Sequence, residues 1–163
     1  MKRFLSAAIF AAMLPTLAQA GTLAFPSEAP VAEITIPDSW KPTETDSGIE
    51  ANSPDTAIYL SVDVADAKSS DKVISDAVDF LSDNGVTIDT TTEKTSEDTL
   101  NGMAMQNLDW DGTDADGPVN IGLSVASPDG ETMLVITYWG TKGQQEKHAK
   151  ALTAIIASLK PVK

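Results

Sequence analysis

The stretch TMLVITYW, residues 132–139, decides the fold of this chain. Both of its faces are apolar, with Met133, Val135 and Trp139 on one and Leu134, Ile136 and Tyr138 on the other. A strand with two apolar faces has to be covered on both sides, which is the situation of a strand inside a sheet. The stretch therefore predicts a central strand with other elements packed above and below it.

A turn and another strand lie directly before this stretch. Residues 127–130 are Ser-Pro-Asp-Gly, in which proline presets φ and glycine supplies a positive φ. The strand predicted at residues 119–127 is apolar on one face and carries only small residues on the other: Gly122, Ser124 and Ala126. So short a turn joins antiparallel neighbours, and the small residues let a helix lie close to the sheet.

A helix is predicted at the C-terminal end. Thr141 and Gln144 stand at the spacing of a capping box, and Pro161 ends the helix. One face carries an apolar stripe at helical spacing, formed by Ala149, Leu152, Ile155, Ile156 and Leu159. We therefore expect this helix to belong to the core.

Strands are also predicted upstream, at residues 32–37, 48–53 and 57–64. The third alternates, with Ile58, Leu60, Val62 and Val64 on one face and Tyr59, Ser61 and Asp63 on the other. The period then becomes helical from Val73 to Leu81, with Ser69 or Ser70 as a helix N-cap and Asn84-Gly85 as a stop. Strands resume at 86–92 and 103–110.

This order of elements predicts an α+β fold, in which an antiparallel sheet of six to seven strands carries two helices. No internal repeat or second domain is indicated, so residues 32–163 form a single predicted domain. Residues 21–31 contain Pro26 and Pro30 among small residues and are interpreted as a flexible N-terminal arm.

The first twenty residues have the pattern of a secretory signal peptide. Lys2 and Arg3 precede a short apolar run, and Ala18-Gln19-Ala20 is a small-x-small cleavage site. The apolar run is shorter than the ~20 residues that a spanning helix needs. We therefore expect cleavage after Ala20 and a periplasmic or secreted protein, which has no Cys for disulfide bonds.

The chain is strongly acidic, with 24 Asp and Glu against 11 Lys and Arg and a net charge of −13. Removal of Lys2 and Arg3 with the leader makes the exported chain more negative still. Such a surface repels phosphate backbones and anionic lipid headgroups. We expect no nucleic-acid partner and no membrane insertion after leader cleavage, whereas a basic partner or cations fit the charge. The sequence does not indicate an oligomeric state.

Two short motifs add a resemblance to a known family. The segment ITIPDSW at 34–40, with Trp40, and the ending IIASLKP at 155–161 frame the predicted elements, and Gly102 opens the second strand after the first helix. Over residues 32–161 the chain resembles the PsbP/DcrB-like superfamily, which includes a photosystem II extrinsic subunit, bacterial envelope proteins and a Ran-binding nuclear-import factor. The resemblance implies an α/β/α sandwich whose members mostly bind proteins and in some cases metal ions. It carries no site motif over to this chain.

The acidic stretch LDWDGTDADGPVN, residues 108–120, is a candidate metal site. Four carboxylates crowd into it: Asp109, Asp111, Asp114 and Asp116. An EF-hand loop needs oxygen ligands at positions 1, 3 and 5, Gly at 6 and an acid at 12. Neither Asp109 nor Asp111, taken as position 1, places the required residues at these positions. The stretch therefore indicates a turn between two strands, with divalent-ion binding by the four carboxylates as the alternative.

No catalytic pattern occurs in the sequence. It has no Cys, and its one His, His148, lies beside Lys147 and Lys150, where we expect it to be exposed. Hydrolase, zinc-protease and nucleotide-binding motifs are missing, and the acidic run 93–98 indicates a solvated loop. The sequence predicts no enzymatic activity and no cofactor, and a carboxylate-based hydrolase remains as a third hypothesis.

Aromatic residues are the other candidates for a binding site. Trp40, Tyr59, Trp110 and Trp139, together with Tyr138, either line a ligand or partner groove or fill the core, and core packing is the favoured interpretation. Met103 and Met105 share a strand face, where thioethers can bind copper but more often pack the core.

From these features we predict an exported, non-enzymatic binding protein of the cell envelope, which acts as a protein-interaction module on another envelope protein. The alternative is a carrier of a small apolar ligand or a divalent cation. A lined apolar cavity would favour the carrier, whereas a structure without a pocket would favour the interaction module.

Overall fold

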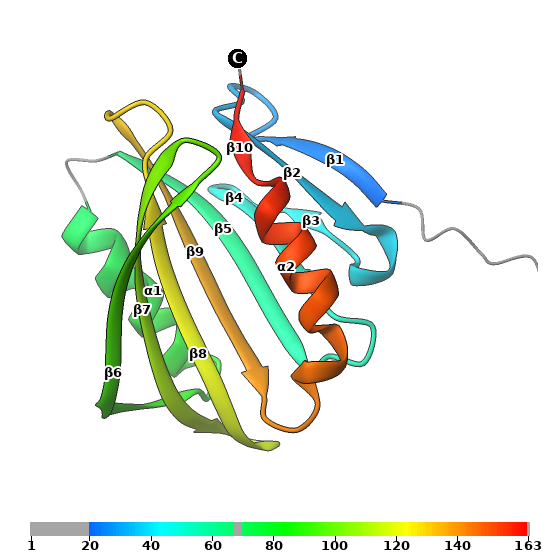
Figure 1. Cartoon of the computed structure of the whole chain (residues 1–163), viewed down its shortest axis with the longest axis vertical. Helices are drawn as coiled ribbons and strands as arrows, with labels where there is room; N and C mark the ends of the chain where they lie inside the picture. The colour runs from blue at the N-terminus through cyan, green and yellow to red at the C-terminus, as the bar shows by residue number, and fades with distance from the viewer. Residues whose placement is uncertain (1–19, 67–69, 163) are drawn as a thin grey trace, which may run out of the picture.

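The computed structural model describes residues 20–66 and 70–162, which form an α+β fold. A seven-stranded sheet in the order β3–β4–β5–β9–β8–β7–β6 forms its centre (Figure 1). Its strands are β3 (Thr43–Glu44), β4 (Gly48–Asn52), β5 (Ile58–Asp66), β6 (Thr87–Leu100), β7 (Met103–Asp114), β8 (Gly117–Ala126) and β9 (Thr132–Thr141). All neighbouring strands in it are antiparallel. The predicted fold class is confirmed.

The central position predicted for residues 132–139 is also confirmed. Strand β9 pairs with β5 on one side and with β8 on the other, and its two faces belong to different apolar clusters, Leu134 and Ile136 to one and Val135 to the other. The turn that joins β8 to β9 has the predicted chemistry. Gly130 has φ +84°, and one oxygen of Asp129 accepts the backbone N–H groups of Glu131 and Thr132, at 2.9 and 2.6 Å.

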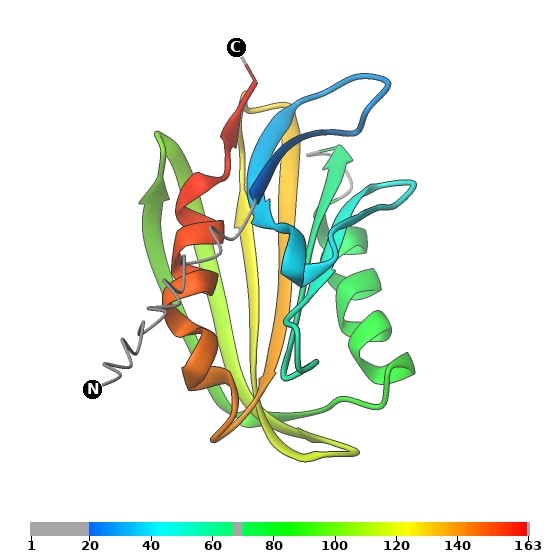
Figure 2. The same ribbon diagram turned by 90° about the vertical axis from the view of Figure 1, so that its right-hand side faces the viewer.

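Two helices cover opposite faces of the sheet, as the edge-on view in Figure 2 shows. Helix α1 (Ser70–Asp83) packs on one face and α2 (Ala149–Ser158) on the other. The predicted end of α1 is confirmed: the Asn84 side chain donates to the carbonyl of Phe80 at 2.8 Å, and Gly85 adopts φ +77°. The sequence therefore defined this helix well at its C-terminal end.

The capping box predicted before α2 is wrong. Thr141 is the last residue of β9, and its backbone N–H donates to the carbonyl of Ala57 at 2.8 Å. The chain then turns at Gly143 and enters a 3₁₀ helix, η3 (Gln145–His148), whose N-cap residue Gln144 makes no side-chain cap hydrogen bond. Sheet pairing extends further than the strand pattern indicated, and it takes Thr141 out of reach of the helix.

The flexible arm predicted for residues 21–31 is also wrong. Residues 20–25 form strand β1 (Ala20–Phe25), which pairs with β2 (Ala32–Pro37) and places Phe25 in the core. The short strand β10 (Lys160–Pro161) pairs with the same β2, which completes a three-stranded sheet. The arm is ordered because Phe25 supplies a large buried side chain. The remainder of the predicted leader lies outside the described residues, so its cleavage stays a prediction.

Two apolar clusters hold these layers together. The first lies between the large sheet, the small sheet and α2, and its largest buried members are Phe25, Ile34, Ile36, Trp40, Ile58, Leu60, Leu134, Ile155 and Leu159. Trp40 enters it from a 3₁₀ turn, η1 (Asp38–Trp40). The second lies under α1 and consists of Leu81, Val86, Trp110, Val119, Ile121, Leu123 and Val135. Burial of apolar surface on both faces stabilises the sandwich.

The acidic run 93–98 belongs to a strand, contrary to the loop expected from its composition. It lies within β6, which pairs with β7 at one edge of the sheet. Almost all of its side chains are exposed. An edge strand beyond the helices can carry polar residues on both faces, so it lacks the alternation that identifies a strand from sequence.

Candidate ligand-binding site

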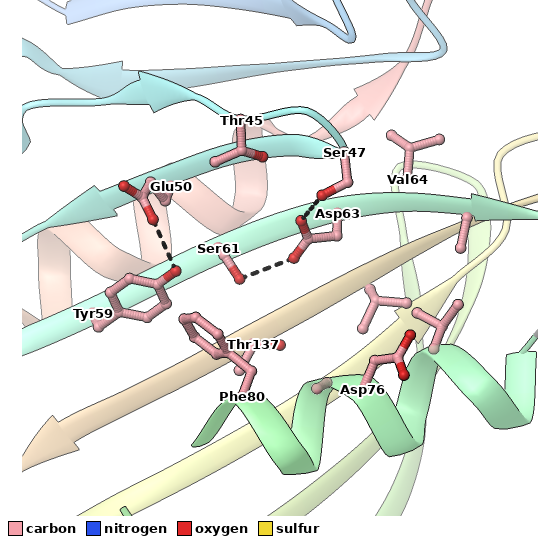
Figure 3. A pocket seen from close by; sticks show the side chains of 14 residues that line it. Thr45, Ser47, Glu50, Tyr59, Ser61, Asp63, Val64, Asp76, Phe80 and Thr137 are labelled. Atoms are coloured by element: carbon pink, nitrogen blue, oxygen red, sulfur yellow. Dashed lines mark hydrogen bonds between the residues drawn. The ribbon is translucent and has the colours of Figure 1, made fainter. Parts of the chain in front are cut away.

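A cavity of about 480 Å³ lies between α1 and the part of the sheet formed by β4, β5 and β9. Figure 3 shows side chains that line it. They come from the β3–β4 turn (Thr45, Ser47), from β4 (Glu50), from β5 (Tyr59, Ser61, Asp63, Val64, Ala65), from α1 (Val73, Asp76, Ala77, Phe80) and from β9 (Val135, Thr137). Its volume falls in the range of small-molecule binding sites, roughly 300–1,000 Å³.

Strand alternation places the polar residues of β5 in this cavity. Leu60 and Val62 belong to the core on the α2 side, so the residues between and beside them face α1. Ser61 lies opposite Glu50 of β4 and opposite Thr137 of β9, which brings the three side chains into one row across the sheet. The polar face that the sequence showed in this strand is therefore the wall of a site.

The turn before β4 brings a further hydroxyl to the same wall. A Cβ atom on Gly48 would lie 1.9 Å from the carbonyl oxygen of Val62, so only glycine lets the two strands approach this closely. The carbonyl of Ser47 accepts the backbone N–H of Val64 at 2.7 Å. The hydroxyl of Ser47 donates to Asp63 at 2.6 Å. The turn thus fixes Asp63 from one side.

One end of the cavity has an aromatic wall. Tyr59 stacks on Trp139 with ring centroids 4.2 Å apart, and Phe80 of α1 approaches Tyr59 at 5.6 Å. Phe80 is 37% exposed, which is unusual for so large an apolar side chain in this molecule. The aromatic wall is therefore partly open to solvent and can receive an apolar group.

The polar wall consists of oriented carboxylates. The Tyr59 hydroxyl donates to Glu50 at 3.2 Å, and the Ser61 hydroxyl donates to the second oxygen of Asp63 at 3.2 Å (Figure 3). Burial, and then the negative charge of Glu50, raise the pKa of Tyr59 well above its usual range. Tyr59 therefore remains a donor at neutral pH, and the two carboxylates are held as acceptors.

The charge of this lining has one sign. Among the described residues of the lining, three are acidic, Glu50, Asp63 and Asp76, and none is Lys, Arg or His. Beside the lining, Lys72 forms an ion pair with Asp76 on the exposed surface of α1 and offsets the charge of that carboxylate. Glu50 and Asp63 have no such ion pair among the described residues, so the described lining carries a net negative charge.

Thr137 is the one deeply buried polar side chain of β9 in this cavity. It is 2% exposed, and its hydroxyl has no hydrogen-bond partner among residues 20–66 and 70–162. Among the described residues, Asn120 Oδ1 is the fully buried side-chain oxygen without a partner, so the Thr137 hydroxyl is open to the cavity. It can therefore bond to a ligand that enters the cavity.

The structure brings together only part of the predicted aromatic set. Tyr59 and Trp139 stack beside the cavity, as described. Trp40 lies in the core on the opposite face, with its ring edge against His148. Trp110 packs under α1, and its indole N–H donates to Glu93 at 3.1 Å. Trp40 and Trp110 therefore do not form a groove with the other two.

The acidic stretch forms the hairpin between β7 and β8, as its turn chemistry indicated. Asp111 pairs with Lys142 at 2.7 Å. One oxygen of Asp114 accepts the backbone N–H groups of Asp116 and Gly117, at 2.9 and 3.0 Å. The described part of the chain contains no group of three or more His, Cys, Asp or Glu placed to hold a metal ion. A metal-binding role for Asp109, Asp111, Asp114 and Asp116 stays a hypothesis.

His148 is more buried than the sequence indicated. Its side chain is 18% exposed, and Nε2 lies 2.7 Å from an oxygen of Asp55 in the turn between β4 and β5. Hydrogen bonds from His148 and then Ser53 lower the pKa of Asp55 well below its usual range. The Ser53 hydroxyl donates to Asp55 at 2.9 Å, so these three residues are not arranged as a Ser–His–Asp relay, in which serine bonds to the histidine.

Other hollows among the described residues either lack an aromatic side chain or are smaller. Spaces of about 540 and 590 Å³ near the ends of the sheet have no aromatic side chain in their lining. On the α2 face, two smaller spaces of about 280 and 170 Å³ are both lined by Asp109 and Tyr138. Burial, and then the charge of Glu146, raise the pKa of Tyr138 to about 12. The α1-side cavity is thus the best-formed candidate.

Sequence reasoning missed most of this site. Glu50, Asp76, Phe80 and Thr137 were not selected, and Asp63 was placed on a polar strand face without a role. The alternation of Tyr59, Ser61 and Asp63 was the available signal. It could not distinguish a cavity wall from a solvent-exposed face, because the position of α1 over β5 is not encoded in the local pattern.

Comparisons with known proteins identify the fold. No protein-family model and no curated protein matches the chain. Among solved structures, cyanobacterial PsbP (CyanoP) from Synechocystis superposes with a TM-score of 0.60 at 10% identity, covering 90% of this chain and 94% of that protein. The chain has a PsbP-like fold.

Two further structures support the PsbP-like fold. LpqN, a protein involved in cell envelope biogenesis of Mycobacterium tuberculosis, matches with a TM-score of 0.56 at 14% identity, covering 89% of this chain and 91% of LpqN. A protein from Bacteroides thetaiotaomicron matches with a TM-score of 0.53 at 14% identity. The match covers 81% of this chain and 45% of the Bacteroides chain. The described residues of our chain include no helix that is long and apolar enough to span a membrane.

Proposed function

We propose that this chain is an exported, non-enzymatic binding protein of the cell envelope, which holds a small molecule in the cavity between α1 and the sheet. The cavity of about 480 Å³ carries this proposal, because aromatic side chains and oriented carboxylates line it together. The signal-peptide pattern at the N-terminus supports export. The involvement of the structurally similar LpqN in envelope biogenesis supports the compartment.

The lining residues suit retention of a ligand and not its chemical conversion. The part of the lining that the structure describes contains neither His nor Lys as a base, and the hydroxyls of Ser47 and Ser61 both donate to Asp63. Asp63 accepts both hydroxyls, and no imidazole or amine of the described lining stands beside either serine to activate it. An apolar group can lie against Phe80 and Tyr59 while a polar group meets the carboxylates.

The interaction-module hypothesis now takes second place. It offers a partner either the sheet edge or the acidic loops, and β6 is the long edge of the large sheet. The register of β6 breaks between Asp89 and Lys94, and the strand carries Glu93, Glu97 and Asp98. Bulges and charges on an edge strand oppose pairing with another chain. Binding of another envelope protein stays a prediction.

Dye binding to the exported protein tests the proposed function. We expect the neutral apolar dye N-phenyl-1-naphthylamine to bind with increased fluorescence. The variant Ala77→Leu, which fills the cavity from α1, should abolish the signal. Ala157→Leu on the exposed face of α2 is the matched control and should bind like the parent. Equal signals from all three proteins, or no signal from the parent, would contradict the proposal.

A further inference from the structure

We propose that the ligand of this cavity is an organic monocation, with a primary ammonium head and an apolar arm. This inference rests on the proposed function and specifies its ligand class. It follows from three properties of the described lining: the sign of its charge, its surplus of hydrogen-bond acceptors, and the apolar side chains on its helix side.

The charge of the lining selects a cation. Glu50 and Asp63 lie on the sheet side of the cavity, and Asp76, whose charge is offset by Lys72, lies on the helix side (Figure 3). The two sheet carboxylates therefore give the lining its net negative charge. Charges between two protein layers are less screened than charges on an open surface, and a lining of one sign concentrates counter-ions. An anionic head would be repelled, and a neutral head would leave the carboxylates uncompensated.

The hydrogen-bond inventory selects a donor-rich head. The donors of Tyr59, Ser47 and Ser61 are all engaged with carboxylates inside the cavity. A carboxylate offers about four lone-pair sites, so both Glu50 and Asp63 can accept further bonds. Thr137 adds a hydroxyl that is open to the cavity and has no hydrogen-bond partner among the described residues. A primary ammonium group has three donors and no acceptor, which matches this surplus of acceptors.

The apolar wall selects an organic cation over a metal ion. Calcium takes roughly six to eight oxygen ligands, whereas Phe80, Val73 and Ala77 form much of the helix side of this cavity. An alkyl or aryl arm would bury these side chains, including the exposed part of Phe80. The faces of Tyr59 and Phe80 also attract cations that approach them.

Three probes of equal length separate these contributions: n-hexylamine, 1-hexanol and hexanoate, whose heads are positive, neutral and negative at pH 7.5. Each is titrated by calorimetry and by displacement of N-phenyl-1-naphthylamine from the exported protein. We expect hexylamine to bind at least about tenfold more tightly than hexanol, and hexanoate to bind most weakly. Hexyltrimethylammonium has the same charge without N–H donors and should fall between hexylamine and hexanol.

Two conservative variants localise the effect. Asp63→Asn keeps the shape of the side chain and should weaken hexylamine about tenfold while leaving hexanol unchanged. Thr137→Val should weaken hexylamine about fivefold. It should also leave the free protein as stable as the parent or more so, because the hydroxyl that it removes has no partner. Glu50→Gln repeats the charge test if Asp63→Asn does not fold.

A matched control separates the site from the overall charge of the protein. Asp116→Asn removes one exposed carboxylate from the β7–β8 turn, away from the cavity lining. It should leave the affinity for hexylamine within twofold of the parent. An equal loss in Asp116→Asn and Asp63→Asn would overturn the proposal, because bulk charge would then explain the binding.

The outcomes also distinguish this inference from the proposed function. If hexylamine and hexanol bind equally and both displace the dye, the cavity binds small molecules but the cation inference is wrong. If none of the probes binds and the dye gives no signal with the parent, the proposed function fails, and the ligand class fails with it.

Discussion

The two faces of the seven-stranded sheet differ in how completely they are packed. On the α2 face, Ile58, Leu60 and Val62 of β5 join Ile155 and the small sheet in a continuous apolar core. On the α1 face, Tyr59, Ser61 and Asp63 of the same strand line a cavity. Adjacent residues of one strand thus serve the core and the candidate site in alternation. The comparison shows that a polar strand face inside a sandwich is a functional indication, since stability alone would favour apolar residues there.

The largest expected effect tests the packed face. Ile155→Asp places an unpaired charge among buried apolar side chains, so we expect a loss of more than about 4 kcal/mol in the free energy of unfolding. Thr153→Asp, at an exposed position of the same helix, is the matched control and should change it by less than about 0.5 kcal/mol. Denaturant titration measures both, and equal stabilities of the two variants would show that α2 is peripheral.

The next effect compares the faces within one strand. Leu60→Ala leaves a void in the core and should cost about 2–5 kcal/mol. Ser61→Ala removes one hydroxyl from the cavity wall and should cost less than about 1.5 kcal/mol, because Ser47 still donates to Asp63. The same denaturant titration applies. If Ser61→Ala costs as much as Leu60→Ala, the α1 face is as fully packed as the core and our distinction between the faces is wrong.

Much of this architecture could be predicted from local patterns. The two apolar faces of residues 132–139 placed β9 at the centre, β2 begins and ends as predicted, and α1 ends at its Asn-Gly stop. These elements have a period that a single segment displays. By contrast, β1 depends on pairing with β2, and the two-residue strand β10 exists only through the same distant partner. Pairings of this kind leave no signal in the segment itself.

The candidate site was less predictable, for a related physical reason. Tyr59 and Trp139 were selected as aromatic residues, and the structure stacks them. Glu50 and Thr137 reach the same cavity through cross-strand register with Ser61, and Phe80 through the docking of α1. Composition instead drew attention to the four aspartates of the β7–β8 hairpin, because density of charge along the chain is visible without a structure.

A pH titration tests the contact that joins the start of the α2 layer to the β4–β5 turn. The pKa of Asp55 is lowered in the folded state, first by its hydrogen bond with His148. A lowered folded pKa stabilises the protein above the unfolded value of about 3.9, and that contribution disappears as the pH falls through the folded value. The stability difference between the parent and Asp55→Asn should therefore shrink from pH 5 down to pH 2.5. A constant difference would contradict the contact.

The smallest expected effect concerns the four aspartates of the acidic β7–β8 hairpin, which belong to neither apolar cluster. We expect removal of divalent ions by a chelator to leave the melting temperature within about 1 °C. A site saturated at 100 times its dissociation constant would contribute ~2.7 kcal/mol, which corresponds to a shift of roughly 5–10 °C. Millimolar calcium should act no more strongly than sodium chloride at equal ionic strength. A calcium-specific shift that Asp111→Asn with Asp114→Asn removes would make the hairpin a metal site.

The central claim is that the α1 face, and not the α2 face, holds a small organic cation. An amide ¹H–¹⁵N NMR titration of the exported protein with n-hexylamine tests it most directly, because it reports binding residue by residue. We predict saturable shifts confined to residues 45–65, 73–80 and 135–139, and their loss in Asp63→Asn. Saturable shifts centred instead on Met105, Asn107 and Leu152 around the smaller α2-side space, or non-saturating shifts spread over the surface carboxylates, would contradict it.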